Sequence, residues 1–507
     1  MITGKNYIGN SLMADGSITF QTFNPQTNSA NAWVMTEVSV EELQIALRLA
    51  QSAFKVYRKY SGTQRAAFLD KIAEEIEDLG QELLDTYCAE SGLPQSRAEG
   101  ERGRTVFQLR SFAALLREGN WPETSIDLAQ PDRQPLPKVD LRKTSIPLGP
   151  VAVFGSSNFP LAYSTAGGDT ASALAAGCSV VVKSHPMHAG TGELVAGAII
   201  RAAQATGMPN GVFSNLNSKG IDIGVQLVQH PIIKAVGFTG SICGGRALFD
   251  LGNARPEPIP VFAEMGSINP VVICPGALRS KAEFWAKSYA DSIVLGAGQF
   301  CTNPGLLLAV ESEGLDRFSK ELSAELSQAP SLCMLHPDIH SAFERLKKDV
   351  STQAGVTMAS TVQETRENYA GQALAEVSGA QFLLNPKLHQ EVFGPFSLLV
   401  RCKDEQELLQ IIEGLEGQLT GTVLAEPDDY PQLEVLIDTL QQRVGRLIFN
   451  GVPTGVEVCP SMQHGGPYPA STDARFTAVG LHSILRWIRP IAFQNFPAEL
   501  LPKELQV

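Results

Sequence analysis

Hydrophobic residues recur at helical spacing in the first part of the chain. From residue 40 to residue 57 they fall three or four positions apart, and Ser39 with Glu42 forms the S-x-x-E pattern that caps a helix start. A second helical period runs from Arg65 to Tyr87, with acidic residues between its apolar positions. Both stretches have one apolar face, so we expect surface helices packed on a globular body.

The pattern changes after three prolines between residues 131 and 137. Residues 139–146 alternate apolar with polar side chains, which predicts a half-exposed strand. Beyond residue 150, helix-like stretches separate short apolar runs at 151–154, 179–183, 211–213, 235–238, 271–273, 306–310, 396–400 and 447–449. Buried parallel strands that alternate with helices produce this rhythm. We therefore predict an α/β fold, with a second α/β domain that begins near residue 265.

Length and charge narrow the class of protein. A chain of 507 residues exceeds the size of a single core, about 250 to 300 residues, so at least two domains are expected. The net charge of −13 leaves no general basic surface for DNA or RNA. The N-terminus lacks a secretory pattern, and the longest apolar run, 170–182, is shorter than the roughly 20 residues of a membrane span. We expect a cytoplasmic protein without nucleic-acid or membrane partners.

Familiar motifs are mostly missing. The eight cysteines never form a CxxC pair, which favours reduced thiols over a zinc cage or a disulfide framework. GxGxxG, Walker A, GxSxG and HExxH patterns do not occur. The histidine pairs 185/188 and 336/340 lack a third ligand at a suitable spacing, so we predict no metal site.

One cysteine stands in a setting that suits chemistry. Cys301 lies in GAGQFCTNPG, a glycine-rich junction between an apolar helix and the strand at 306–310. A thiol in such a polar turn can be reached and ionised, although a buried apolar cysteine is the plain alternative. Three more turns carry polar side chains: Glu264 ends an apolar strand in FAEMGS, Asn158 stands in GSSNFP, and Glu391 opens EVFGP.

These four segments, with VVKS at 181–184 and FTGS at 238–241, resemble the aldehyde dehydrogenase superfamily in the same order along nearly the whole chain. The resemblance implies a three-part fold. A Rossmann-like cofactor-binding domain would comprise residues 1–126 and 149–264, and an α/β catalytic domain residues 265–462. Residues 127–148 and 480–500 would form a β-stranded oligomerisation arm, which implies a homodimer or a homotetramer.

The resemblance also implies the chemistry. Cys301 would attack the aldehyde as a thiolate, and the Asn158 amide with the Cys301 backbone N–H would hold the oxyanion. Glu264 would activate the water that hydrolyses the thioester, and it could also deprotonate the thiol. As plainer alternatives, Asn158 could cap a turn and Glu264 could be an ion-pair partner.

The cofactor would be NADP or NAD. By resemblance, Lys183 contacts the adenosine ribose, Glu391 holds the nicotinamide ribose, and Phe393 shares its loop. Ser241 would offer its hydroxyl and a helix N-terminus to the pyrophosphate, with Gly240 and Gly245 allowing close approach. Many NAD-preferring members carry a glutamate three residues after the lysine, where Pro186 stands here. Its loss removes repulsion against a 2′-phosphate, which slightly favours NADP.

The substrate would be a small aldehyde. Ser157 replaces the tryptophan of the commonest members, and with CTNPG at 301–305 and the segment 463–473 it resembles the branch of α-ketoglutaric semialdehyde dehydrogenases. This branch oxidises 2,5-dioxopentanoate to 2-oxoglutarate, and it also includes NADP-linked fatty aldehyde dehydrogenases. A carboxylate clamp would come from one of four arginines, each of which could equally be an ordinary surface charge: Arg102, Arg104, Arg110 and Arg475. A long-chain substrate would need an apolar tunnel, for which the candidates are Phe107, Phe112 and Phe159.

Three rival functions are open. A CoA-acylating dehydrogenase typically lacks the glutamate that stands here at position 264. A silent structural protein of the same fold would be expected to have lost a reacting residue, and none is missing. A cysteine hydrolase using Cys301 would need a histidine base that no spacing identifies, and it would leave the cofactor segments unexplained.

Overall fold

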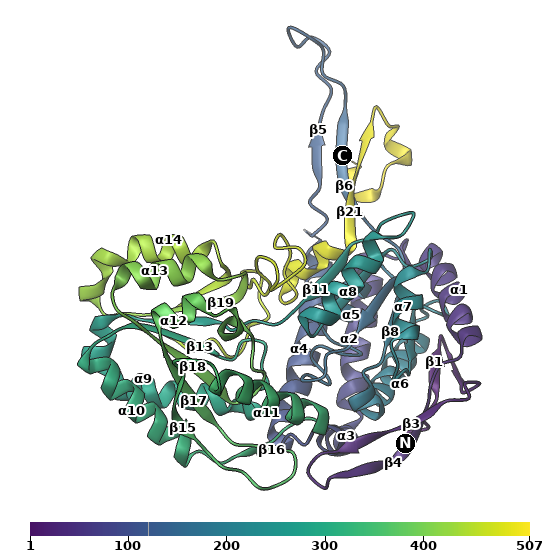
Figure 1. Ribbon diagram of the computed structural model, residues 1–507. Coiled ribbons are helices and arrows are strands. Elements are labelled where there is room, and N and C mark those ends of the chain that lie inside the picture. The colour runs from purple at the N-terminus through teal and green to yellow at the C-terminus, as the bar shows by residue number, and fades with distance from the viewer. Residues whose placement is uncertain (120, 507) are drawn as a thin grey trace.

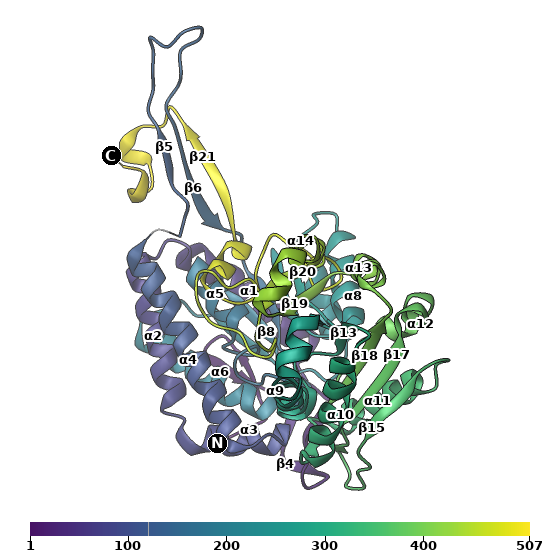
Figure 2. The same cartoon turned by 90° about the vertical axis from the view of Figure 1, so that its left-hand side faces the viewer.

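The computed structural model describes residues 1–119 and 121–506 as two α/β bodies side by side, with a narrow arm that projects away from them (Figures 1 and 2). The helices are α1 Val40–Tyr57, α2 Gly62–Glu77, α3 Gly80–Ser91, α4 Gln95–Glu118, α5 Gly168–Ala176, α6 Ala189–Ala205, α7 Asp222–Gln229, α8 Ile242–Asn253, α9 Pro275–Val294, α10 Glu313–Gln328, α11 Pro337–Ser351, α12 Gly379–Leu384, α13 Glu405–Gly414 and α14 Leu433–Gln441. The α/β prediction is confirmed.

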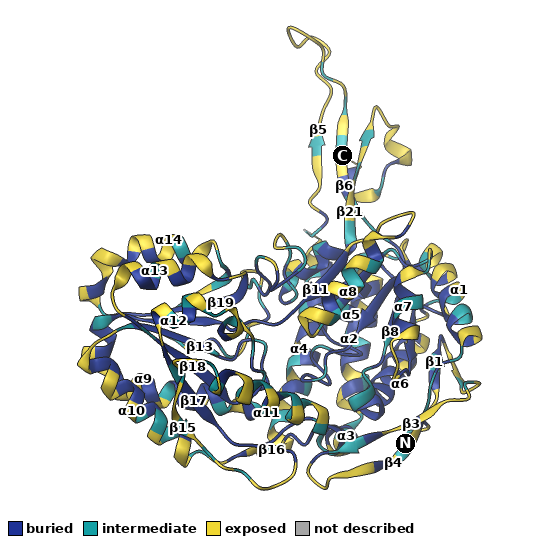
Figure 3. Ribbon diagram, viewed as in Figure 1, coloured by how far each residue is buried: buried dark blue, intermediate teal, exposed yellow. Residues whose placement is uncertain are grey.

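The first body is built on a seven-stranded sheet in the order β11-β10-β7-β8-β9-β1-β2. Its strands are β1 Asn6–Ile8, β2 Ser11–Met13, β7 Val151–Phe154, β8 Val180–Lys183, β9 Phe213–Leu216, β10 Ala235–Thr239 and β11 Val261–Glu264. The five consecutive strands from β11 to β9 are parallel and largely buried on both faces (Figure 3). In β7, Val151 and Val153 pack toward helices α2 and α4 to α6, whereas Ala152 and Phe154 pack toward α1 and α7. Both faces need apolar side chains, which explains the continuous apolar runs in the sequence.

The second body repeats this plan with the strand order β15-β17-β18-β13-β12-β19-β20, in which only β15 runs antiparallel. Its strands are β12 Pro270–Ile273, β13 Leu306–Val310, β15 Thr357–Thr361, β17 Ala373–Ser378, β18 Phe396–Cys402, β19 Gln418–Leu424 and β20 Val444–Phe449. Alternate residues of β13 face two cores. Leu306 and Leu308 pack with α11 to α14, whereas Leu307 and Ala309 pack with α9 and α10.

The arm is a three-stranded antiparallel sheet made from two distant parts of the chain (Figure 2). Its strands are β5 Ser125–Asp127, β6 Leu141–Pro147 and β21 Ile488–Gln494. Within the predicted arm segment 480–500 the strand begins only at Ile488, because Leu481–Trp487 forms a 3₁₀ helix with Trp487 fully buried against the first body. Two short pairs complete the described strands: β3 Thr19–Asn24 with β4 Ser29–Thr36, and β14 Leu332–Cys333 with β16 Tyr369–Ala370.

Two further boundaries differ from the sequence prediction. The helical period from Arg65 to Tyr87 is divided into α2 and α3, because Gly80 adopts a left-handed φ of 56° at the junction. The strand expected at 211–213 is instead β9, since Val212 closes a turn onto the Pro209 carbonyl. Among the described residues, no helix combines the length and the apolarity that a membrane crossing requires.

Candidate active site

The site forms where parallel strands of the first body end. Glu264 is the last residue of β11, Thr239 the last of β10, and the turn that carries Asn158 follows β7. These strands are neighbours in the sheet, so their carboxyl ends meet at one edge. Ligands of open α/β sheets bind at such an edge.

The second body supplies Cys301 on a constrained turn. Gly298 precedes it with φ of 66°, and a side chain there would come within 2.2 Å of the Gly394 backbone. The Asn269 side-chain amide donates to the carbonyls of Cys301 and Asn303, both at 2.9 Å. The turn therefore has a fixed conformation and lies directly against the loop that carries Glu391.

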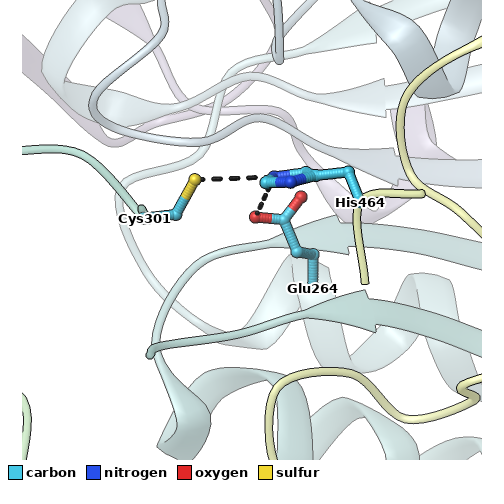
Figure 4. Close-up of side chains that lie close together, drawn as sticks. All are labelled: Glu264, Cys301 and His464. Atoms are coloured by element: carbon cyan, nitrogen blue, oxygen red, sulfur yellow. Dashed lines mark hydrogen bonds and ion pairs between the residues drawn. The ribbon is translucent and has the colours of Figure 1, made fainter. Parts of the chain in front are cut away.

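A histidine that the sequence did not single out joins Glu264 and Cys301 (Figure 4). His464 Nε2 lies 3.5 Å from Cys301 Sγ and 3.1 Å from Glu264 Oε1. Both His464 and Glu264 are almost fully buried. No spacing in the sequence identifies a histidine base for Cys301, and only the fold brings His464 beside the thiol.

His464 reaches the site because its segment returns to the first sheet. Met265 N–H donates to the Ala470 carbonyl at 2.8 Å, and Thr472 N–H donates to the Ala263 carbonyl at 3.1 Å. These bonds fasten residues 470–472 along β11. The only sequence signal was that His464 lies inside the family-like segment 463–473.

Cys301 is not an acidic thiol in this environment. Burial raises the pKa of the Cys301 thiol well above its usual value, and the negative charge of Glu264 raises it further. The positive charge of Arg104 acts in the opposite direction. A resting thiol of this kind needs a nearby base before it can attack a carbonyl.

Asn158 lies beside the thiol with its amide directed at the Cys301 turn. Its Nδ2 donates to the Gln299 carbonyl at 3.0 Å, and the side chain is largely buried. An amide nitrogen has two N–H bonds, so one can serve this carbonyl while the other faces a ligand.

A cleft of about 310 Å³ opens beside these residues. It is lined by Asn158, Glu264 and Cys301 together with two of the predicted cofactor segments, including Gly240, Ser241, Glu391 and Phe393. Burial raises the pKa of Glu391 to about 7, against the lowering effect of a hydrogen bond from the Ser267 backbone. Ser241 caps α8, where its Oγ accepts the Gly244 N–H at 3.2 Å.

Two of the expected cofactor residues are not among those that line this cleft. Lys183 ends β8 outside the lining of this cleft, and its Nζ donates to the Ser218 carbonyl at 2.8 Å. Burial lowers the pKa of Lys183 to about 8. A side chain at Gly245 would come within 2.6 Å of Met265 Sδ, so this glycine lets α8 pack against the end of β11.

The four candidate arginines differ in their exposure and in their partners. Arg110 is exposed and pairs with Glu77, and Arg475 is exposed and pairs with Asp473. Arg102 reaches only the Gly80 carbonyl. Arg104 alone of the four lies beside the site, with its Nη2 donating to the Tyr163 hydroxyl at 2.8 Å.

The expected apolar tunnel is not formed by the three named phenylalanines. Phe107 is 52% exposed on α4, and Phe112 belongs to the core of the first body. Only Phe159 lies near the thiol, where its ring packs at 5.6 Å against Phe300.

The histidine pairs show no third ligand in the part of the chain that the structure describes. His185 and His188 stack at 5.0 Å, and burial lowers the pKa of both. The trio Glu264, Cys301 and His464 does bring metal-ligating atom types within 4.8 Å of one another. The absence of a metal site stays a prediction.

Comparisons with known proteins point to one family. A sequence model of the aldehyde dehydrogenase family matches residues 12–343. An α-ketoglutaric semialdehyde dehydrogenase 2 of Azospirillum brasilense is 48% identical over 507 residues, covering 100% of this chain and 97% of the relative. An α-ketoglutaric semialdehyde dehydrogenase of Acinetobacter baylyi is 44% identical over 514 residues, covering 99% and 96%.

Solved structures share the fold. A 1-pyrroline-5-carboxylate dehydrogenase from Thermus with bound NAD aligns with a TM-score of 0.82 at 20% identity, covering 97% of this chain and 92% of that one. A betaine aldehyde dehydrogenase variant of Staphylococcus aureus in complex with NAD⁺ gives 0.83 at 18% identity, covering 98% and 97%.

Proposed function

Because this chain belongs to the aldehyde dehydrogenase family, we propose that it oxidises 2,5-dioxopentanoate (α-ketoglutaric semialdehyde) to 2-oxoglutarate with NAD or NADP. Two relatives named for this substrate match essentially the whole chain at 48% and 44% identity. The observation that carries the proposal is the meeting of Cys301, Glu264 and Asn158 at one cleft.

The reaction begins at the Cys301 thiol. Its proton passes to the adjacent pair formed by His464 and Glu264, and the sulfur forms a bond with the aldehyde carbon. The carbonyl oxygen becomes an oxyanion, which the free N–H of the Asn158 amide and the Cys301 backbone N–H hold. Fixed donors of this kind cost no reorganisation when the charge develops.

A bound nicotinamide cofactor supplies the acceptor for the hydride that leaves this carbon. The carbonyl then re-forms as a thioester on Cys301. Glu264 takes a proton from water, the resulting hydroxide adds to the thioester, and the carbon–sulfur bond breaks. The carboxylate product leaves and the thiol is regenerated. Hydrolysis in place of CoA transfer agrees with the presence of Glu264.

His464 next to Cys301 and Glu264 also makes a cysteine hydrolase conceivable on geometry alone. That function would leave the cleft beside the thiol, which Ser241 and Glu391 line, without a role. Family membership favours the dehydrogenase.

The cleft fits a dinucleotide. Ser241 presents a helix N-terminus, where backbone N–H groups attract a pyrophosphate. Glu391 is a buried carboxylate with Oε2 packed on Gly266, and a ribose diol would offer it hydrogen bonds. We assign Lys183 to the adenosine ribose, because the half-buried ammonium stands at the carboxyl end of β8.

NADP use is the finer part of the proposal. Pro186 begins a short 3₁₀ turn after β8 at the position where a glutamate would bind the ribose hydroxyls. Without that carboxylate a 2′-phosphate meets less repulsion, and Lys183 adds attraction. We therefore expect NADP to be accepted at least as well as NAD, in a reducing cytoplasmic setting that keeps the Cys301 thiol free.

Initial rates test the proposal. Purified protein would be given NADP or NAD with 2,5-dioxopentanoate, hexanal or decanal, and reduced cofactor would be followed by absorbance. We expect the highest kcat/KM with 2,5-dioxopentanoate and no activity in Cys301→Ala. Higher kcat/KM with decanal would favour a fatty aldehyde dehydrogenase, and no reduction of either cofactor would overturn hydride transfer.

A further inference from the structure

One face of α4 points three charged side chains toward the active site. Arg97, Glu101 and Arg104 are spaced by four and three residues, which places them on one side of a helix. Glu101 accepts the backbone N–H groups of Leu161 and Ala162 at 2.8 and 2.9 Å. This carboxylate therefore fixes the turn that carries Asn158, and α4 is tied directly to the catalytic loop.

Arg104 differs from its neighbours because its charge is not balanced. Arg97 lies 3.5 Å from Glu101, whereas no carboxylate of the described chain lies within ion-pair distance of Arg104. Its Nη2 donates to the Tyr163 hydroxyl, and its Nε is buried without a hydrogen-bond partner. A buried donor that is unsatisfied costs about 1 to 3 kcal/mol, more for a charged group, unless a ligand supplies the acceptor.

Arg104 is connected to the thiol through two aromatic contacts. Its guanidinium lies 4.9 Å from the centre of the Tyr163 ring and 5.8 Å from that of Phe159. Tyr163 in turn lies 6.3 Å from the His464 ring, and Phe159 packs on Phe300, the residue before Cys301. None of Arg104, Tyr163 and Phe300 lines the cofactor cleft.

We propose that Arg104 and Tyr163 form a subsite for the carboxylate of the aldehyde substrate. The inference rests on the proposed function, because it assigns the recognition of a substrate that carries a carboxylate at the opposite end of a short chain from its aldehyde. The guanidinium would donate to the carboxylate in the fork geometry that arginine favours, and the Tyr163 hydroxyl, which accepts from Arg104, would donate its own proton.

The other nearby arginines are already engaged. Arg446 donates from Nη2 to the carbonyls of Pro453 and Gly455 at 2.9 and 3.0 Å, which shapes that loop. Arg97 stacks on the Phe159 and Phe300 rings at 4.5 and 4.6 Å while it pairs with Glu101. The Nε groups of Arg97 and Arg446 are also buried without a partner, but Arg97 pairs with a carboxylate and Arg446 is held by two carbonyls. Arg104 has only the bond to the Tyr163 hydroxyl, so of these three cations it has the most donor capacity left for a ligand.

Substrate pairs separate recognition from catalysis. The variants are Arg104→Met, Arg104→Lys and Tyr163→Phe, with Arg110→Met as a matched control on the exposed side of the same helix. For each, kcat/KM would be measured with 2,5-dioxopentanoate and with pentanal, which has the same chain length and no carboxylate. Thermal melting would check that each variant is folded.

We expect Arg104→Met to lower kcat/KM for 2,5-dioxopentanoate by about 100-fold and that for pentanal by less than about threefold. Arg104→Lys should lose about tenfold on the anionic substrate, because a lysine lacks the fork. Arg110→Met should match the wild type. If Arg104→Met does not fold, the same selective loss in Arg104→Lys and Tyr163→Phe carries the test.

Two failures are distinguishable. An equal loss on both substrates in Arg104→Met would mean that Arg104 acts on the thiol or on the loop, and kcat/KM values unchanged for both substrates would mean that it does nothing for recognition. Either result overturns the subsite while the proposed function stands. A wild-type enzyme that prefers pentanal to 2,5-dioxopentanoate would overturn the proposed function itself.

Discussion

The groups around Cys301 shift the pKa of its thiol in opposite directions, and the net shift favours the neutral thiol. Burial and the carboxylates of Glu264 and Glu391 raise its pKa, and Arg104 lowers it. Since the pKa is raised above the usual range, the thiolate should be scarce at pH 7 in the free enzyme. We predict that the rate of Cys301 alkylation by iodoacetamide increases about tenfold for each pH unit from 7 to 9.

The alkylation should be followed by mass spectrometry of the peptide that contains Cys301, because all eight cysteines are free thiols. Cys243, which is exposed, provides the internal reference. A Cys301 rate that is already maximal at pH 7 would show a thiolate stabilised by its neighbours and would contradict this prediction.

His464 and Glu264 should act at different steps. Their positions suit a division in which His464, 3.5 Å from the sulfur, takes the thiol proton, while Glu264 activates water. We predict that Glu264→Gln forms reduced cofactor in a rapid burst of one equivalent and then stalls at the thioester. His464→Gln should lose the burst, with a rate lower by about 100-fold.

Stopped-flow absorbance in the first turnover distinguishes the two variants. A burst in both would restrict His464 to the hydrolysis step. Absence of a burst in both would mean that Glu264 is also needed to form the thiolate. The sequence alone could not raise this question, since positions 264 and 464 are brought together only by the pairing of residues 470–472 with β11.

At the scale of elements, the turn before Cys301 depends on one glycine. Gly298 has a left-handed φ of 66°, and an added Cβ would lie 2.2 Å from the Gly394 backbone. We predict that Gly298→Ala displaces both the thiol and the Glu391 loop, with kcat/KM lowered by at least about 100-fold. Gly207→Ala is a control with a similar φ of 69° and open space around it, and it should retain activity.

Both variants carry the cost of an alanine at positive φ, of order 1 kcal/mol, so their melting temperatures should fall in the same direction. Only Gly298→Ala should lose activity. Equal activity in the two variants would mean that contact with Gly394 does not position the thiol.

Element boundaries could be predicted from the sequence where they depend on local contacts. The start of α1 was predictable because its cap is local: Ser39 accepts the Glu42 N–H, and the Glu42 carboxylate returns to the Ser39 N–H. The break between α2 and α3 was not, since the apolar period continues through Gly80. The role expected for Gly245 stays a prediction, and the contact that this glycine permits, with Met265, lies outside its own helix, where no local pattern records it.

At the scale of the whole molecule, the site exists only where the two bodies meet. Asn158 and Glu264 belong to the first body, Cys301 and Glu391 to the second, and His464 to the segment that returns after β20. The two sheets could be predicted from the sequence, because each strand and each helix has its own local pattern of apolar residues. The relative position of Arg104 and Cys301 depends on docking between the bodies, and no local period records it.

The arm leads to the last prediction. Both edges of its sheet, β5 and β21, are unpaired along their outer sides, and two leucines near its tip, Leu128 and Leu136, are 58% and 69% exposed. Open edges and exposed apolar side chains favour cover by another subunit. We therefore propose that the arm holds a homodimer or a homotetramer together, and that Leu128→Asp with Leu136→Asp shifts it toward the 54.5 kDa monomer.

Light scattering after size-exclusion chromatography measures this mass. Leu384→Asp is the matched control, because this leucine on α12 is 77% exposed and far from the arm in sequence and in space (Figure 1). The control should keep the wild-type mass. The arm variant should keep its fold, since neither leucine belongs to a core, so a lower mass would reflect lost association. A wild-type protein that is already monomeric, or an arm variant of unchanged mass, would assign the arm a different role.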